Sequence, residues 1–477
     1  MDYIQAKELD PIHDNIIRTI EFDPVGRNKT LWQFACFCSA QREKCSIALD
    51  GGWGTGKTFF LKQLEMLFDA FSNHPKQLKP QEQKIIKQCF KGFNNELNCS
   101  IQPHCCVYYD AWLNDNSDDP LRSILYELVK QAKHKFVKKS KMEYLRTACS
   151  IFDAFTGKNT SSLVDLANNT NPVHELEAQK SFYDTFSKFL NSFLPQGKGR
   201  LLVLIDELDR CKPSYAVQLL ERIKHYLSNK RVSFVFAINN EQLQHTIKAF
   251  YGDGFDAYQY LNRFFNYRLS LPPPDIDYLN KYYGFDQSEK DFDSRLYMEV
   301  CNAFIQEHSL SFRDATRYQQ WVKIVCESFK KHGSNSDSIS WKFVIYIVVP
   351  IVLGLRTTNK QLFDDFMNGK DPSPLLEILR ICPIANRFLE YPDKALVEEK
   401  FDFDNVFWDI MPSVESIYNK LFKYKNDVDE REIYTPLLYD TKPFEFTKEM
   451  SDTIFSASNF MADFIKFDTN TEEPAHG

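Results

Sequence analysis

One short segment near the amino end constrains the fold more than any other part of the chain. Residues 51–58 read GGWGTGKT and match the pattern G-x-x-x-x-G-K-[ST]. An apolar run at residues 46–49 precedes them, and residues 59–71 (FFLKQLEMLFDAF) carry apolar side chains at helical spacing. The glycines therefore lie at a predicted strand-to-helix turn, where backbone N–H groups and a helix N-terminus point at one spot. This arrangement predicts a loop that holds nucleotide phosphates.

The residues of this loop have separate predicted tasks. Glycine permits close approach of the phosphates, Lys57 brings a positive charge to the β- and γ-phosphates, and the Thr58 hydroxyl can bind a bridging Mg²⁺. The alternative interpretation is a tight glycine turn with an incidental lysine. The predicted nucleotide-binding residues are Gly51, Gly52, Trp53, Gly54, Thr55, Gly56, Lys57, Thr58 and Phe59.

Two carboxylates follow another apolar run. Residues 201–205 (LLVLI) lead into Asp206 and Glu207. We predict that Asp206 holds Mg²⁺ through water, and that Glu207 orients or deprotonates the attacking water as a catalytic residue. The two acids alone would also suit the cap of a following helix.

A pair of asparagines follows the apolar run 233–237. A polar side chain at such a strand end can sense the γ-phosphate or align the water, and Asn239 is the predicted catalytic residue here. Asn240 is not separable from it by sequence. Asparagine also favours turns and helix caps, so that interpretation stays open.

The pattern along the chain predicts an α/β fold with a parallel sheet covered by helices on both faces. The prolines 272–274 predict a boundary near residue 275, and a mainly helical, lid-like domain is expected over 276–390. A helical insertion is expected at about 113–198, and residues 391–477 form an acidic, aromatic extension without a clear period. The five predicted strands are residues 46–49, 106–109, 201–205, 233–237 and 268–271.

Composition limits the partners. The net charge of −7 over 477 residues gives no general attraction to nucleic acid. The basic segment 130–146 could bind a nucleic-acid backbone, although a solvated helix face is the favoured explanation. No signal peptide is evident and the twelve cysteines show no C-x-x-C spacing, so we expect reduced thiols and a cytoplasmic protein. The apolar run 343–355 is too short to span a bilayer, which predicts a buried helix.

With these motifs in place, the chain resembles the KAP family of P-loop NTPases over roughly residues 10–330. The resemblance implies an additional-strand P-loop sandwich in which the strand of the acids is not adjacent to the strand of the glycine loop. It also implies ATP as the nucleotide and a helical domain that turns Arg313 toward the phosphates as a catalytic residue. The motifs that carry it are DPVGR (23–27), GGWGTGKT (51–58), YDAW (109–112), IDELDRC (205–211), FVFAINNEQL (234–243) and YLNRFF (260–265).

The resemblance also bears on function. Many family members carry transmembrane helices between the two nucleotide motifs, whereas residues 59–200 hold no long apolar run. The chain therefore resembles the soluble bacterial members, some of which are linked to the exclusion of infecting phage. We expect an ATPase switch that acts on a protein partner or on further copies of itself. A nucleotide-dependent assembly scaffold, a nucleic-acid-associated ATPase and a small-molecule phosphotransferase remain alternatives. Arg210 and Arg263 suit either a trans-acting finger or ion pairs.

Overall fold

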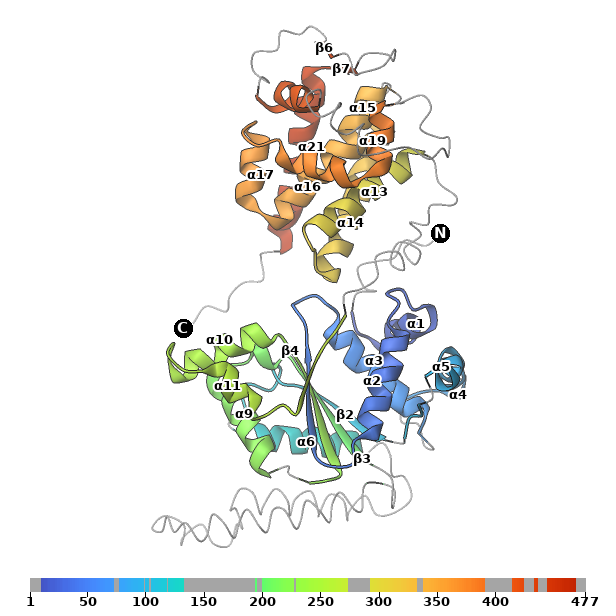
Figure 1. The fold of residues 1–477 in the computed structure, drawn as a ribbon, viewed down its shortest axis with the longest axis vertical. Coiled ribbons are helices and arrows are strands. Elements are labelled where there is room, and N and C mark those ends of the chain that lie inside the picture. The colour runs from blue at the N-terminus through green and yellow to red at the C-terminus, as the bar shows by residue number, and fades with distance from the viewer. Residues whose placement is uncertain are drawn as a thin grey trace. The chain divides into compact units, whose positions relative to one another are not determined.

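A computed structural model presents the chain as two compact units, Met1–Tyr282 and Tyr283–Gly477, which are described separately (Figure 1). The division falls at residues 282 and 283, compared with the boundary predicted near 275. The structure describes residues 10–72, 77–97, 99–102, 104–117, 119–132, 194, 200–226, 229–272, 292–332, 338–390, 414–423, 433–435 and 444–468.

A five-stranded parallel sheet forms the centre of the first unit. The order is β2-β3-β4-β1-β5, so β4 lies between β1 and β3. This confirms the α/β sandwich and the separation of the two motif strands that the resemblance implies. All five predicted runs are strands of this sheet. Their bounds are β1 Cys45–Asp50, β2 His104–Asp110, β3 Arg200–Asp206, β4 Val232–Ile238 and β5 Tyr267–Ser270.

Helices cover both faces of the sheet, as Figure 1 shows. Alternate residues of β1 to β4 enter two separate cores: Leu201 and Val203 of β3 pack with the second helical group, and Leu202 and Leu204 pack with the first. Burial on both faces explains why the strands read as continuous apolar runs. The first group is α1 His13–Phe22, α2 Asn28–Ala40, α3 Lys57–Ala70, α4 Pro80–Cys89 and α5 Lys91–Glu96. The second group is α6 Pro120–Ala132, α9 Pro213–Tyr226, α10 Asn240–Tyr251 and α11 Ala257–Asn262.

The second unit is mainly helical in its described part. Ser311 begins α14 with a cap, since its hydroxyl accepts from the Asp314 N–H at 3.3 Å and donates to the Asp314 carboxylate at 2.6 Å. Its helices are α13 Phe292–Glu307, α14 Phe312–His332, α15 Ile339–Phe343, η3 Val344–Val348, α16 Val349–Thr358, α17 Lys360–Met367, α18 Ser373–Ile381, α19 Pro383–Glu390, η4 Asn419–Lys423 and α21 Lys448–Asp468. Two short strands, β6 Ile433–Thr435 and β7 Phe444–Phe446, pair antiparallel.

The apolar run of the second unit belongs to a longer helix than predicted. Elements α15, η3 and α16 join into 20 helical residues, Ile339–Thr358, which is long and apolar enough to cross a membrane. The expectation of a helix too short to span was therefore wrong, because helical residues flank the run on both sides. The buried position was predicted correctly: 78% of the most apolar window lies inside the protein. The Tyr318 hydroxyl donates to the Pro350 carbonyl there at 3.0 Å.

Two other expectations meet the structure only in part. Residues 391–477 showed no clear period, yet Lys448–Asp468 forms the 21-residue helix α21. Its buried residues Met450, Ile454 and Ala457 have helical spacing. Of the predicted insertion at 113–198, the structure describes α6 and little beyond it, and most of the basic segment 130–146 lies outside the described residues.

Candidate nucleotide site

The glycine loop joins β1 to α3 at the carboxyl edge of the sheet. Gly54 and Gly56 have positive φ angles of 76° and 86°, a region that favours glycine. A Cβ atom on Gly51 would lie 2.8 Å from the Thr55 hydroxyl, closer than side chains tolerate. The loop therefore requires glycine at these three positions to hold its curvature. Phe59, at the start of α3, packs against the core.

Lys57 is the first residue of α3, and its ammonium group folds back onto the loop. Its Nζ donates to the Gly51 carbonyl at 2.5 Å and to the Gly52 carbonyl at 2.9 Å. Burial lowers the Lys57 pKa, and nearby carboxylates oppose that effect, led by Asp209 and Asp206. The lysine is thus placed at the mouth of the loop, in the field of the acidic residues that follow β3.

Asp206 lies at the end of β3 beneath the loop and is only 1% exposed. It accepts a hydrogen bond from the Tyr108 hydroxyl at 2.9 Å, and the Thr58 hydroxyl is a second partner. Burial raises the Asp206 pKa, while these two hydroxyls favour the charged form and lower it. The structure brings together Thr58 and Asp206, the residues predicted to hold Mg²⁺. Tyr108 was not predicted.

Glu207 follows Asp206 in a left-handed backbone conformation, with φ of 58° and ψ of 28°. Such a conformation is uncommon outside glycine and often occurs at functional sites. Its carboxylate contacts the Arg210 Nε at 2.6 Å. Burial, followed by repulsion from Asp206, raises the Glu207 pKa to about 7. A carboxylate with such a pKa can accept a proton near neutral pH.

Trp53 connects the glycine loop with the segment after β3. Its indole Nε1 donates to the Asp209 carboxylate at 2.9 Å. Asp209 and Arg210 belong to the short helix η2, Leu208–Arg210. The Arg210 guanidinium lies 5.9 Å from the Trp53 ring centroid and 5.6 Å from that of Trp112. The sequence marked both tryptophans as motif residues, but it did not predict these contacts.

The two asparagines after β4 differ in the structure. The Asn239 side chain caps α10 by accepting from the Gln242 N–H at 3.2 Å. The Asn240 N–H donates to Asp50 at the end of β1 at 2.9 Å, and its buried side-chain oxygen has no hydrogen-bond partner within the described part of the chain. Asn240 therefore has the uncommitted oxygen, whereas Asn239 uses its own as a helix cap.

Arg27 is a residue of the site region that sequence reasoning did not assign. Only 6% exposed, it donates to the Thr55 carbonyl in the glycine loop at 2.7 Å and to the Pro272 carbonyl after β5. Asp23 accepts from the Arg27 and Asn28 N–H groups and so fixes the turn before α2. Burial lowers the Arg27 pKa to about 10, which leaves it charged at neutral pH. The DPVGR motif was the signal that could have revealed this role.

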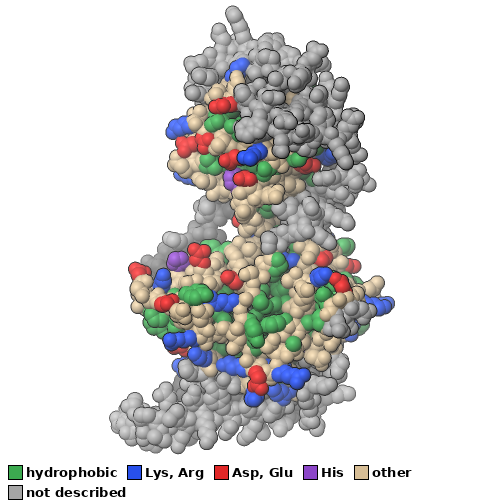
Figure 2. All heavy atoms as spheres, in the orientation of Figure 1, with side chains coloured by type: hydrophobic (Ala, Val, Ile, Leu, Met, Phe, Trp, Pro, Cys, Tyr) green, Lys and Arg blue, Asp and Glu red, His purple; other side chains and the backbone are tan. Residues whose placement is uncertain are grey.

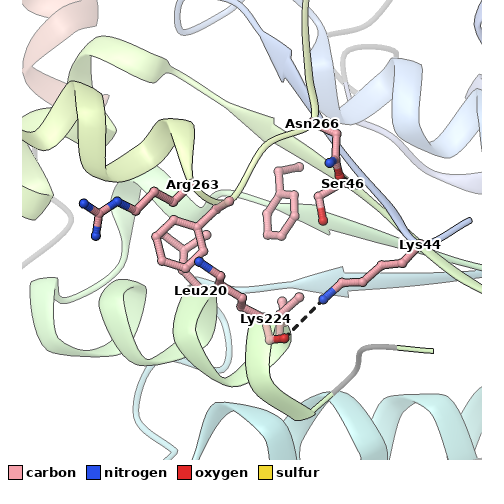
Figure 3. Close-up of a pocket in the computed structure, with 9 residues that line it drawn as sticks. Lys44, Ser46, Leu220, Lys224, Arg263 and Asn266 are labelled. Carbon is pink, nitrogen blue, oxygen red and sulfur yellow. Dashed lines mark hydrogen bonds between the residues drawn. The ribbon is translucent and has the colours of Figure 1, made fainter. Parts of the chain in front are cut away.

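Of the other candidate arginines, Arg263 belongs to the first unit and lies away from the loop, whereas Arg313 belongs to the second unit. Arg263 lines a pocket of about 200 Å³ near Ser46 and Asn266, at the amino ends of β1 and β5, and its guanidinium points away from Lys44 (Figure 3). The glycine loop follows the opposite end of β1. Arg313 is exposed in the first turn of α14, in the second unit. Its predicted reach toward the phosphates stays a prediction.

No cluster of three or more His, Cys, Asp or Glu side chains is placed to hold a metal ion among the residues that the structure describes. The Thr58–Asp206 pair remains the candidate for a divalent cation, because a bridging cation also takes phosphate and water oxygens.

Comparison with known proteins agrees with this geometry. No curated protein matches the chain. The model of the KAP family P-loop domain matches residues 29–327, which include the glycine loop, the acids after β3 and Arg313. The match spans well over half of the 477 residues, so the chain belongs to the KAP family of P-loop NTPases and is a nucleotide-binding protein of that class.

Proposed function

We propose that the protein binds ATP with Mg²⁺ and hydrolyses it. The observation that carries this proposal is the pairing of buried Asp206 with Thr58 beneath the glycine loop, next to Glu207 with a pKa of about 7. The donor set fits a magnesium ion, since a hydroxyl and a carboxylate are hard oxygen ligands at the foot of a phosphate loop. When bound, the ion would neutralise charge that develops on the phosphates.

The chain's own residues then have distinct tasks. The glycine loop would direct its N–H groups at the phosphates, and Lys57 would exchange its two carbonyl partners for phosphate oxygens. Glu207 would accept a proton from the attacking water. Asn240 is better placed than Asn239 to align that water, because the Asn239 oxygen already accepts from Gln242. Arg313 remains a candidate for a charge contributed by the second unit.

Nucleotide turnover tests the proposal. Purified protein should release phosphate from ATP with Mg²⁺ and lose this activity in EDTA. Lys57→Ala should reduce turnover on the order of a hundredfold or more through weaker phosphate contacts. Glu207→Gln should bind ATP normally and turn over roughly 100-fold more slowly. GTP in place of ATP measures base preference. Wild-type turnover no higher than that of Lys57→Ala would contradict the hydrolytic proposal.

We further propose that turnover operates a switch in a cytoplasmic protein that acts on a protein partner or on another copy of itself. The support for anti-phage defence is the resemblance to soluble bacterial family members alone. Plaque counts on bacteria that express the wild type, Lys57→Ala or Glu207→Gln test it. We expect the wild type to protect the bacteria and both variants to lose this protection. The mass in solution with ADP and with ATP distinguishes the switch from an assembly scaffold. If the protein is a scaffold, the Glu207→Gln variant should assemble as the wild type does.

A further inference from the structure

The catalytic candidate Glu207 is held in place from several directions. Its N–H donates to the Asp206 carboxylate at 3.0 Å, and its carbonyl accepts from the Arg210 N–H at 3.2 Å. The Cys211 thiol lies 3.5 Å from the same carbonyl. These contacts keep a non-glycine residue in the left-handed region, and the Arg210 Nε holds the end of its side chain at 2.6 Å. The position of the carboxylate thus depends on Arg210.

Arg210 is positioned in turn by the glycine loop. Its guanidinium lies over the rings of Trp53 and Trp112, and its neighbour Asp209 accepts the Trp53 indole N–H at 2.9 Å. The Asp209 carbonyl also accepts from the Thr246 hydroxyl of α10 at 3.2 Å, and Asp209 is only 7% exposed. A shift of Trp53 therefore reaches η2 through a buried hydrogen bond and a ring contact.

Trp53 has a position that packing does not explain. The residue stands between two glycines in the sequence and is 49% exposed, while Trp112 is 53% exposed. Figure 2 shows such hydrophobic side chains at the surface of the first unit among charged ones. A large aromatic ring that remains half exposed contributes little to the core. What the Trp53 ring does contribute is the contact with Asp209 and Arg210.

We propose that Arg210 is a positioning residue for Glu207, and that Trp53 couples this position to the state of the glycine loop. The inference rests on the proposed role of Glu207 in hydrolysis. Phosphates that enter the loop contact its backbone on both sides of Trp53, and the resulting shift passes through Asp209 and Arg210 to the Glu207 carboxylate. The loop would thereby bring the base into position only when it is filled.

Kinetics of Arg210→Gln, Trp53→Phe and the double variant test the proposal. Arg210→Gln should lower kcat about 10- to 100-fold with KM changed less than about threefold, because the base is misplaced while the loop is intact. Trp53→Phe keeps a ring and loses the indole N–H, so it should lower kcat in the same direction. The double variant should be no slower than Arg210→Gln alone, since both residues act through one path. Multiplying losses would overturn the coupling.

A pH profile separates positioning from loss of structure. The charged groups that act on Glu207 are Asp206 and Asp209, which raise its pKa, and Arg210 and Lys57, which lower it. Removal of the Arg210 charge should move the acid limb of kcat toward higher pH, and a merely destabilised protein would keep the wild-type limb. Arg42→Gln is the matched control, an exposed arginine in the loop before β1. This variant should retain the wild-type kcat and the wild-type acid limb of the pH profile.

A measurement that does not depend on ATP turnover tests the coupling through Arg210 independently of the proposed hydrolysis. In urea unfolding, the effects of Trp53→Phe and Glu207→Gln should be non-additive when Arg210 is present and additive in the Arg210→Gln background. Additive effects in both backgrounds would overturn the inference, whether or not the protein hydrolyses ATP. If the protein shows no ATP turnover but the unfolding effects are non-additive as expected, the hydrolytic function is refuted and the coupling through Arg210 remains supported.

Discussion

Replacing Glu207 with glutamine is expected to stabilise the first unit at pH 8 far more than at pH 5. Burial and repulsion from Asp206 raise the Glu207 pKa from 4.5 to about 7. The folded state therefore binds this proton more tightly than the unfolded chain, and stability falls as the pH rises from 4.5 to 7. With about 1.4 kcal/mol per pH unit, the charged carboxylate costs about 3 kcal/mol at pH 8 and less than about 1 kcal/mol at pH 5.

Hydrogen exchange in urea measures this difference in the first unit alone, in peptides that cover β1, β3 and β4. Glutamine removes the charge at every pH and keeps the shape of the side chain, so the gain should appear only where Glu207 ionises. Asp253→Asn is the matched control, an exposed carboxylate in the loop after α10 that should change stability equally little at both pH values. A gain of the same size at pH 5 and pH 8, or a loss at pH 8, would refute the reasoning.

Three glycines provide further predictions. Gly56→Ala should destabilise the first unit by about 1–2 kcal/mol and weaken ATP binding, because φ is 86° and the new Cβ would lie 3.2 Å from the Arg27 Nη1. Gly252 has a φ of 102°, and an added Cβ would meet no atom within 4 Å. Gly252→Ala should therefore lower stability in thermal unfolding through backbone strain alone and leave the ATP affinity in calorimetry unchanged. Gly354→Ala should destabilise the second unit by about 1–3 kcal/mol, since its Cβ would lie 2.4 Å from the Phe304 ring. Phe304→Leu in the same chain should recover part of that loss, and no recovery in urea unfolding would contradict the packing explanation.

Strands β1 to β4 were predictable because this parallel sheet buries both of their faces, which leaves a recognisable apolar run in the sequence. Leu201 to Ile205 are all fully buried, and no polar residue interrupts them. Helix α21 was not predicted, although Met450, Ile454 and Ala457 have helical spacing. An aromatic residue also occupies the half-buried position Phe455 between them, and that mixture hides the period.

Some residues of the candidate site could be predicted from the sequence and others could not. The loop and Asp206 follow from local patterns, because the chemistry there depends on neighbours in sequence. Arg27, Tyr108 and the Trp53–Asp209 contact do not, since their bonds join residues 28, 98 and 156 positions apart. Sequence spacing also could not separate Asn239 from Asn240, because the difference is which side chain turns back to cap α10.

The buried guanidinium of Arg27 makes two distant stretches of backbone move as one. It holds the Thr55 carbonyl of the glycine loop and the Pro272 carbonyl, at the last described residue of the first unit. A displacement of the loop that breaks neither bond must carry the exit of β5 with it. Arg27 therefore forms a direct mechanical link between the phosphate loop and the backbone that follows β5.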